Sequence, residues 1–230
     1  AVSRLPPSPA PKPPCAGGRW TRSVEAGGVG WRLRKPMLNR FFGGSSERPR
    51  GEAVEDVSPR SPALRTPRLP PGQRETVKWP VLHYGRVPVV ETDRWQLDVR
   101  GLVSRPFSLD WDEFQSLPRV RVFADFHCVT QWSRLGNIWE GVSLRVLLER
   151  AGPLPEARFA IVTGYDDGWT TNLPLADLAA DDVLVADRHD GVPLDADHGG
   201  PARLMVPLLY AWKSAKWIRA IELVSEDQLG

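Results

Sequence analysis

Alternation of apolar and polar positions predicts strands from residue 95 onward. In WQLDVRGLV (residues 95–103), Trp95, Leu97 and Val99 alternate with polar side chains, which is the period of a strand with one buried face. Similar apolar runs predict further strands at residues 120–127, at 158–174 as two runs around a DDG turn, at 182–194 as two runs around Asp190-Gly191, at 203–207 and at 216–224.

Helical patterns are few and short. DWDEFQSLP (residues 110–118) offers Asp110 as N-cap and Glu113 to complete a capping box, and it ends at a proline. LRVLLERAG (residues 144–152) places four apolar side chains on one face before a glycine at the C-terminal cap position. Many short strands and few helices, without a regular βαβ alternation, predict an α+β domain with mixed strands.

Charge and composition divide the chain near residue 68. Residues 1–70 carry 13 Lys and Arg against 5 Asp and Glu, whereas residues 71–230 carry 17 against 23. The first part is rich in Pro, Arg and Ser, and it cannot bury enough apolar surface to offset the entropy of ordering. We therefore predict a disordered Pro/Arg-rich tail at residues 1–68 and a folded domain at residues 69–230. Met37 begins MLNRFFGG and offers an alternative start, which would make residues 1–36 an upstream extension.

The sequence pattern gives no signal for export or membrane insertion. No apolar segment of the secretory type follows the basic run WRLRKP, and no window approaches the roughly 20 apolar residues of a membrane span. One cysteine in the predicted domain argues against a disulfide-built secreted fold. We expect a cytoplasmic protein without a membrane span and without a nucleic-acid partner.

Cys128 is the cysteine of the predicted domain, in FADFHCVTQWSR. It follows the strand predicted at 120–127, and the helix predicted at 144–152 comes next, so the pattern predicts a strand-to-helix step around it. A lone buried cysteine most often packs as a small apolar side chain, whereas a thiolate is also a soft metal ligand. A thiol hydrolase with His127 or His198 as base is a third interpretation, although adjacent strand residues point to opposite faces, which disfavours His127.

Polar residues and glycines interrupt the apolar strand ends at four places. Glycine permits close approach of the backbone to a ligand, and Arg203, Lys213 and Lys216 are cations suited to a phosphate. Each feature alone is weak evidence for a site. The four stretches are LHYG (82–85), HCVTQWSR (127–134), TGYDDGWTTN (163–172) and HGGPARLMVPLLYAWKSAKW (198–217).

The order of these motifs resembles the molybdopterin-binding oxidoreductase domain of the sulfite oxidase family. The chain is most similar to its small bacterial stand-alone members, which are related to the catalytic subunit of protein-methionine-sulfoxide reductase. The resemblance covers about residues 68–230 and implies a mixed, strand-rich sulfite oxidase-type fold with few short helices. It rests on LHYG, HCVTQWS, WEGVSLRVLLERAG, TNLPL, GGPARLMVP and WKSAKW.

The resemblance also implies the chemistry and its residues. The cofactor would be Mo-molybdopterin, with Cys128 as the molybdenum ligand and catalytic residue. The reaction would be oxygen-atom or two-electron transfer on a small sulfoxide or other oxidised sulfur or nitrogen compound, coupled to an external electron-transfer partner. The implied cofactor contacts are His83, Tyr84, Thr163, His198, Arg203, Ser214, Ala215 and Lys216.

Departures from the family pattern keep two alternatives open. Arg134 and Arg188 are the nearest candidates for an Arg-rich sulfite pocket, and neither lies in a recognisable motif. Sulfite oxidase activity is one alternative, and a non-catalytic binding module with a vestigial metal site is the other. The sequence shows no haem-binding module, no immunoglobulin-like dimerisation domain and no twin-arginine signal. SEDQLG follows the last predicted strand directly, which suggests a truncated C-terminus.

Overall fold

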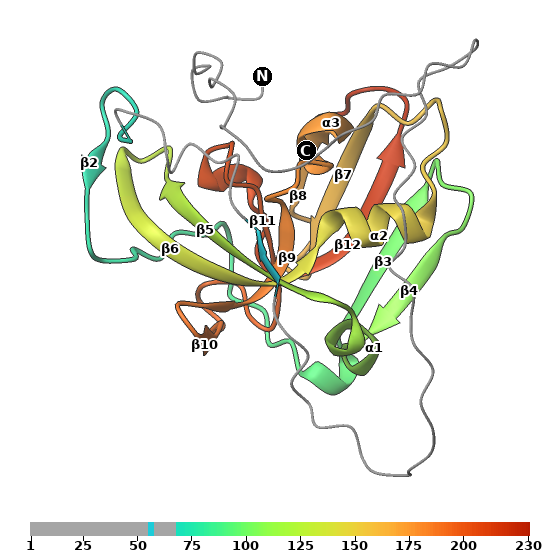
Figure 1. Cartoon of the computed structure of the whole chain (residues 1–230), viewed down its shortest axis with the longest axis horizontal. Coiled ribbons are helices and arrows are strands. Elements are labelled where there is room, and N and C mark those ends of the chain that lie inside the picture. Colours follow the sequence, from blue (N-terminus) through green and yellow to red (C-terminus); the bar gives the residue numbers. More distant parts are fainter. Residues whose placement is uncertain (1–54, 58–67) are drawn as a thin grey trace, which may run out of the picture. The chain divides into compact units, whose positions relative to one another are not determined.

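Two mixed β-sheets carry the fold (Figure 1). The computed structural model describes residues 55–57 and 68–230. The first sheet has seven strands, and its main path runs β1 (Glu55–Val57), β5 (Arg119–His127), β6 (Trp132–Ser143), β9 (Leu184–His189) and β10 (Val192–Pro193), with β2 (Arg74–Glu75) paired to β6 and β11 (Arg203–Met205) paired to β9.

The second sheet has five strands, and helices are sparse. Its strand β12 lies parallel to one neighbour, β3, and antiparallel to the other, β7. The predicted α+β class with few short helices is confirmed. The strand order is β4 (Phe107–Asp110), β3 (Gln96–Gly101), β12 (Ile218–Val224), β7 (Phe159–Gly164) and β8 (Thr170–Pro174), and the α-helices of the described residues are α1 (Trp111–Ser116), α2 (Leu144–Ala151) and α3 (Leu175–Leu178).

Both predicted helices form with the predicted caps. The Asp110 side chain accepts from the Glu113 N–H while the Glu113 carboxylate accepts from the Asp110 N–H, which is the complete capping box. Helix α2 buries Leu144 and its other apolar positions in the larger core cluster. It ends at Gly152, which adopts the left-handed conformation at a φ of 65°.

The predicted hairpins are also confirmed. Strands β7 and β8 pair antiparallel around the DDG turn, and β9 pairs with β10 around Asp190 and Gly191. Both turn residues have positive φ, 48° and 82°, as the primed hairpin turns require. These turns bring the strands of TGYDDGWTTN and DVLVADRHDGVPL into register without long connections.

The strand-to-helix step predicted around Cys128 is wrong. Strand β6, with twelve residues, lies between β5 and α2 and pairs antiparallel with β5. The sequence WSRLGNIWEGVS did not predict this strand, because Gly136, Asn137 and Gly141 break the alternation of apolar and polar positions. Cys128 therefore lies in the tight loop of the β5–β6 hairpin, and not at the entry to a helix.

Part of the stretch predicted as a disordered tail forms a strand. Residues Glu55–Val57 make β1, which pairs parallel with the start of β5. Residues 1–54 and 58–67, with Cys15 and Met37, lie outside the described residues, so the predicted domain boundary stays a prediction. Within residues 55–57 and 68–230, every helix is too short or too polar to traverse a bilayer.

Candidate functional site

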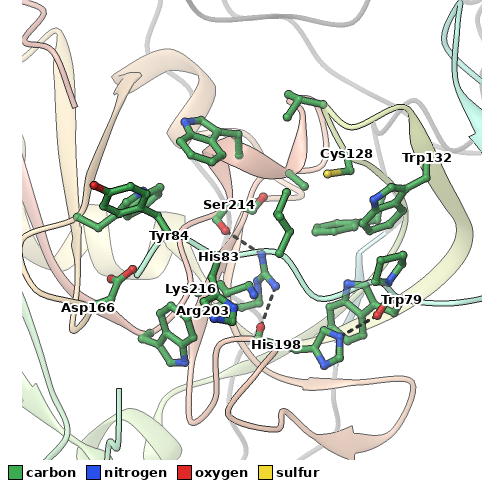
Figure 2. Close-up of a pocket in the computed structure, with 18 residues that line it drawn as sticks. Trp79, His83, Tyr84, Cys128, Trp132, Asp166, His198, Arg203, Ser214 and Lys216 are labelled. Carbon is green, nitrogen blue, oxygen red and sulfur yellow. Dashed lines mark hydrogen bonds between the residues drawn. The ribbon is translucent and has the colours of Figure 1, made fainter. Parts of the chain in front are cut away.

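One cavity brings together most of the residues predicted for the site (Figure 2). It holds about 680 Å³, its open mouth included. The predicted residues that line it come from the coil before β3, the β5–β6 loop and the segments around β11 and β12: His83, Tyr84, Cys128, His198, Arg203, Ser214 and Lys216.

Two predicted contacts do not line this cavity. Thr163 lies on β7, where it pairs with Thr170 and Ala220 inside the second sheet. Ala215 is buried in the larger core cluster, and its carbonyl accepts from the Leu204 N–H. Both residues therefore belong to the framework of the fold and not to the lining.

Cys128 presents a free thiol to the cavity. It is 6% exposed and forms no disulfide. Its Sγ lies 3.1 Å from Thr130 Oγ1, within hydrogen-bond range for a thiol and a hydroxyl. His127 does not line the cavity; its ring Nδ1 lies 2.8 Å from Ser133 Oγ. The pair therefore lacks the thiol–imidazole contact that a cysteine hydrolase would use.

Arg203 is a buried cation without an acidic partner. It is 2% exposed, and the described part of the chain gives it no ion pair. Its Nη1 and Nη2 each donate at 2.8 Å to a carbonyl, of His198 and of Ser214. Burial lowers the pKa of the guanidinium to about 9, so the charge persists at neutral pH. A buried charge of this kind is costly unless it is compensated, which makes the site attractive to an anion.

A second cation lies close to the first. Lys216 Nζ donates to the Asp197 carbonyl at 2.6 Å. Burial first, and the charge of Arg203 next, lower the pKa of Lys216 to about 8. Gly199 lies between the two side chains with a φ of 104°, and a Cβ there would approach Arg203 and Lys216 Cβ atoms to 3.0–3.1 Å. The glycine therefore allows the two cations to approach one backbone segment.

His198 is held from two sides. Its Nδ1 lies 2.8 Å from an Asp195 carboxylate oxygen, and its Nε2 lies 3.1 Å from the Trp79 carbonyl. Its ring also stacks on the Trp79 indole, with centroids 3.8 Å apart. These contacts fix the ring plane beside the cavity and leave the carbonyl of His198 to Arg203.

Two buried polar atoms of the lining have no hydrogen-bond partner among the described residues. They are Nδ1 of His83 and Oδ1 of Asp166. Burial raises the pKa of the Asp166 carboxyl to about 6. Buried polar atoms are rarely left unpaired in native proteins, so both atoms point to a group that the cavity would bind.

Sequence reasoning missed several lining residues. Asp166 and Trp169 lie in TGYDDGWTTN, which the sequence singles out as a whole, but nothing in that stretch distinguishes them. Trp79 precedes the first predicted strand and carries no local signal. Only the fold brings it against His198.

Apolar side chains surround the mouth of the cavity. Four lining residues are 48–75% exposed: Leu82, Tyr84, Val129 and Trp212. Arg134 and Arg188, the nearest candidates for a sulfite pocket, do not line the cavity. Arg134 pairs with Asp190, and Arg188 donates to the Gly191 carbonyl. The entrance is therefore apolar, and the cations lie deeper.

Comparison with known proteins identifies the family of the chain. Residues 84–230 match the family described as the oxidoreductase molybdopterin binding domain. The chain is 46% identical over 164 residues to the uncharacterized oxidoreductase YuiH of Bacillus subtilis (strain 168), covering 71% of this chain and 82% of that protein.

More distant relatives are longer than this chain. This chain is 28% identical over 152 residues to the protein-methionine-sulfoxide reductase catalytic subunit MsrP of Campylobacter jejuni. The matched region covers 59% of this chain and 51%, about half, of that protein. The sulfane dehydrogenase SoxCD of Paracoccus pantotrophus superimposes with a TM-score of 0.59 at 25% identity, over 64% of this chain and 42% of that chain. The chain belongs to the oxidoreductase molybdopterin binding domain family, a sulfite oxidase-like group of oxidoreductases that depend on a molybdenum cofactor.

Proposed function

We propose that the chain binds Mo-molybdopterin in this cavity, with Cys128 as the molybdenum ligand, and exchanges an oxygen atom or two electrons with a small, uncharged substrate. One observation carries the proposal: the free thiol of Cys128 and the unpaired cation Arg203, distant in sequence, line the same cavity (Figure 2). Thiolate suits the metal of such a cofactor, and guanidinium suits its phosphate.

The thiol end of the cavity would hold the metal. A high-valent metal keeps a coordinating thiol deprotonated, so Cys128 would act as a permanent ligand. The cofactor, when bound, supplies the redox and oxygen-transfer chemistry, and the protein supplies binding, orientation and electrostatics. The short β5–β6 loop suits this task because Cys128 N–H donates to Trp132 O at 2.9 Å and its carbonyl accepts from Gln131 N–H at 3.1 Å.

The cationic end would hold the phosphate. Arg203 and Lys216 both carry positive charge at neutral pH, and a phosphate would compensate the buried charge of Arg203. Ser214 lies beside them, with its hydroxyl accepting from the Val206 N–H. His198, held by Asp195 and Trp79, would form one wall of this part of the cavity.

The two unpaired polar atoms fit the pterin. Pterin rings carry amino and amide N–H donors as well as ring acceptors, so a carboxylate oxygen of Asp166 would accept from such a donor. His83 Nδ1 would find a partner in the same way, with Tyr84 beside it on the lining. Thr163 and Ala215 would act indirectly, Thr163 through its pairing on β7 and Ala215 through the carbonyl that accepts from Leu204, the residue after Arg203.

The charge distribution favours an uncharged substrate such as a sulfoxide. Arg203 and Lys216 would be committed to the cofactor, and the rim of Leu82, Val129 and Trp212 offers apolar surface. An anion such as sulfite would lose hydration there without gaining a cation. Electrons would pass to or from an external electron-transfer partner, and the cytoplasm is the proposed compartment.

Replacing the thiol tests the ligand assignment. Cys128→Ser should lose most of its molybdenum and its activity while keeping its circular dichroism, because a hard hydroxyl oxygen is a poor match for a site that uses sulfur. Molybdenum analysis and pterin fluorescence measure the cofactor after expression in a host that makes it. Cys15→Ser is the matched control and should load like the parent. Stoichiometric molybdenum in Cys128→Ser would refute the assignment and favour a role in packing.

Removing the buried cation tests the phosphate end. Arg203→Ala should reduce cofactor affinity about ten- to hundredfold, because a charge-assisted partner is worth roughly 1.5–3 kcal/mol. Arg203→Lys should recover only part of the loss, since it cannot keep both carbonyl contacts. Pterin content after gel filtration measures retention. Arg150→Ala, an exposed arginine in α2, is the control. Equal pterin content in Arg203→Ala and Arg150→Ala would exclude the proposed role of Arg203 in binding the phosphate of the cofactor.

The carboxyl of Asp166 should make stability depend on pH. Its pKa is raised from 3.8 to about 6 in the folded state, so the folded protein holds this proton more tightly than the unfolded chain. The associated stability is complete below about pH 4 and is lost as pH rises to about 6. Asp166→Asn should not lose stability across this pH range, because its side-chain amide does not titrate. Urea unfolding of both cofactor-free proteins measures their free energies of unfolding, and the parent should lose stability relative to Asp166→Asn as pH rises across that window. A difference that does not change with pH would contradict the raised pKa of the partly buried Asp166 carboxyl.

Substrate charge tests the reaction proposed. With the loaded enzyme and a reduced dye, uncharged methyl phenyl sulfoxide should turn over, whereas sulfite with an oxidised dye should be slower by about tenfold or more, since an unpaired anion costs at least 1–3 kcal/mol on desolvation. Trp212→Ala should raise KM for the aryl sulfoxide more than for dimethyl sulfoxide. Sulfite turnover that equals or exceeds sulfoxide turnover would favour the sulfite oxidase alternative.

A further inference from the structure

The residues before the family match contact the loop that carries Cys128. The match begins at residue 84, yet residues 68–76 run along the β5–β6 hairpin and pair with its second strand through β2 (Figure 1). We call residues Arg68–Thr76 the strap. Arg68 anchors one end, because its guanidinium forms a two-pronged ion pair with Asp125, which is buried on β5.

Backbone bonds of the strap reach the loop and the start of β6. Arg74 N–H donates to the Gln131 carbonyl and Thr76 N–H to the Ser133 carbonyl, each at 2.9 Å. Gln131 has a φ of 67°, a conformation that costs a non-glycine residue free energy and persists only where its surroundings enforce it. The strap therefore holds the residue that makes the tight turn behind Cys128 possible.

Gln73 closes a directed chain of hydrogen bonds around Cys128. Ser133 Oγ donates to Gln73 Oε1 at 3.1 Å, and Gln73 Nε2 donates to the Cys128 carbonyl at 3.0 Å. Because the Ser133 hydroxyl donates to Gln73, it accepts from His127 Nδ1, at 2.8 Å. This series of hydrogen bonds starts at His127 and ends at the neighbouring residue, Cys128. Gln73 is the one residue in the series that does not belong to the β5–β6 hairpin.

We propose that the strap positions Cys128, and that Gln73 is the positioning residue that sets the loop geometry from which the thiol enters the cavity. The Cys128 carbonyl accepts from two donors, Gln73 Nε2 and the Gln131 N–H. Both orient the peptide that carries the thiol. The strap then leads to Trp79, which stacks on His198 at the other side of the cavity. One continuous segment thus fixes two walls of the site.

The thiol end is the place where such positioning matters. A metal ligand on a loop needs its backbone held to a fraction of an ångström, and supporting hydrogen bonds commonly provide this. The strap adds that support from outside the hairpin, at a loop of only four residues between β5 and β6. Only the metal measurement below rests on the proposed function, in which Cys128 is the molybdenum ligand. The order of the loop can be measured in cofactor-free protein.

The test compares Gln73→Leu with Arg74→Ala in the full chain, in a Cys15→Ser background. Arg74 belongs to the same strap, its side chain is exposed, and its backbone bond survives the change. In cofactor-free protein, iodoacetamide should alkylate Cys128 about tenfold faster in Gln73→Leu, a change equivalent to ~1.4 kcal/mol. Hydrogen exchange at residues 128–133 should accelerate to a similar degree. Arg74→Ala should match the parent in both.

The loaded enzyme supplies a third measurement. Gln73→Leu should bind less molybdenum and shift the visible thiolate-to-metal absorption band, whereas a role confined to stability would lower the unfolding midpoint and leave that band in place. If Gln73→Leu fails to fold, Gln73→Glu carries the test, because it keeps the acceptor for Ser133 and loses the donor to the Cys128 carbonyl.

The two proposals fail in different ways. Equal alkylation and exchange rates in Gln73→Leu and Arg74→Ala would overturn the role of the strap, even if Cys128→Ser loses its molybdenum. Stoichiometric molybdenum in Cys128→Ser would overturn the ligand assignment, while faster alkylation in Gln73→Leu would still support the strap. A difference confined to the unfolding midpoint would also count against positioning.

Discussion

The buried guanidinium of Arg203 is the constraint on which the arrangement of the site depends. A cation this deep loses its hydration, and the described residues offer it carbonyl oxygens and no carboxylate. Those carbonyls come from His198 and Ser214, on either side of β11, so satisfying Arg203 also fixes both flanking segments. The rings of Phe126 and Trp139 approach its charge at 5.4 and 5.7 Å. Partial compensation from dipoles and rings leaves a site that a bound anion would complete.

The thiol and the cation are held by different parts of the first sheet. Cys128 lies at the tip of the β5–β6 hairpin, and Arg203 lies on β11, which joins that sheet through β9. Strand β6 pairs with both β5 and β9, so it fixes the separation between the two ends of the cavity. A long cofactor with a metal at one end and a phosphate at the other needs such a rigid spacing. The sheet would supply that spacing to a cofactor bound by both residues.

Local patterns predicted the strands and turns well and the site only in part. Alternation and turn chemistry located β3, β7 and the Asp190-Gly191 turn, because one buried face and a positive φ leave direct traces in sequence. Strand β6 left none, since Gly136 and Gly141 lie at irregularities in its pairing with β5 and β9, and Asn137 donates side-chain bonds to backbone carbonyls. The strap could not be predicted from local sequence either, because its two-residue strand β2 forms only by pairing with β6.

The site residues show the same division. The resemblance indicated Cys128 and Arg203 as members of one site, and the cavity brings them together. Asp166 could not be singled out, because its significance is a buried oxygen without a hydrogen-bond partner, which arises only when the chain folds around the β7–β8 turn. Thr163 had the right motif, but pairing within the second sheet keeps it off the lining.

Under the proposed function, the rim and the deep cations together would set the substrate selectivity of the loaded cavity. Once a phosphate compensates Arg203 and Lys216, the lining still offers exposed apolar side chains such as Val129 and Trp212. Substrates would then be selected by their desolvation cost, and an uncharged sulfoxide loses far less hydration than a sulfite dianion. On this proposal, a change of rim residues would alter the substrate preference and leave the residues that bind the cofactor unchanged. In this chain the proposed function assigns the preference for an uncharged substrate to the apolar rim.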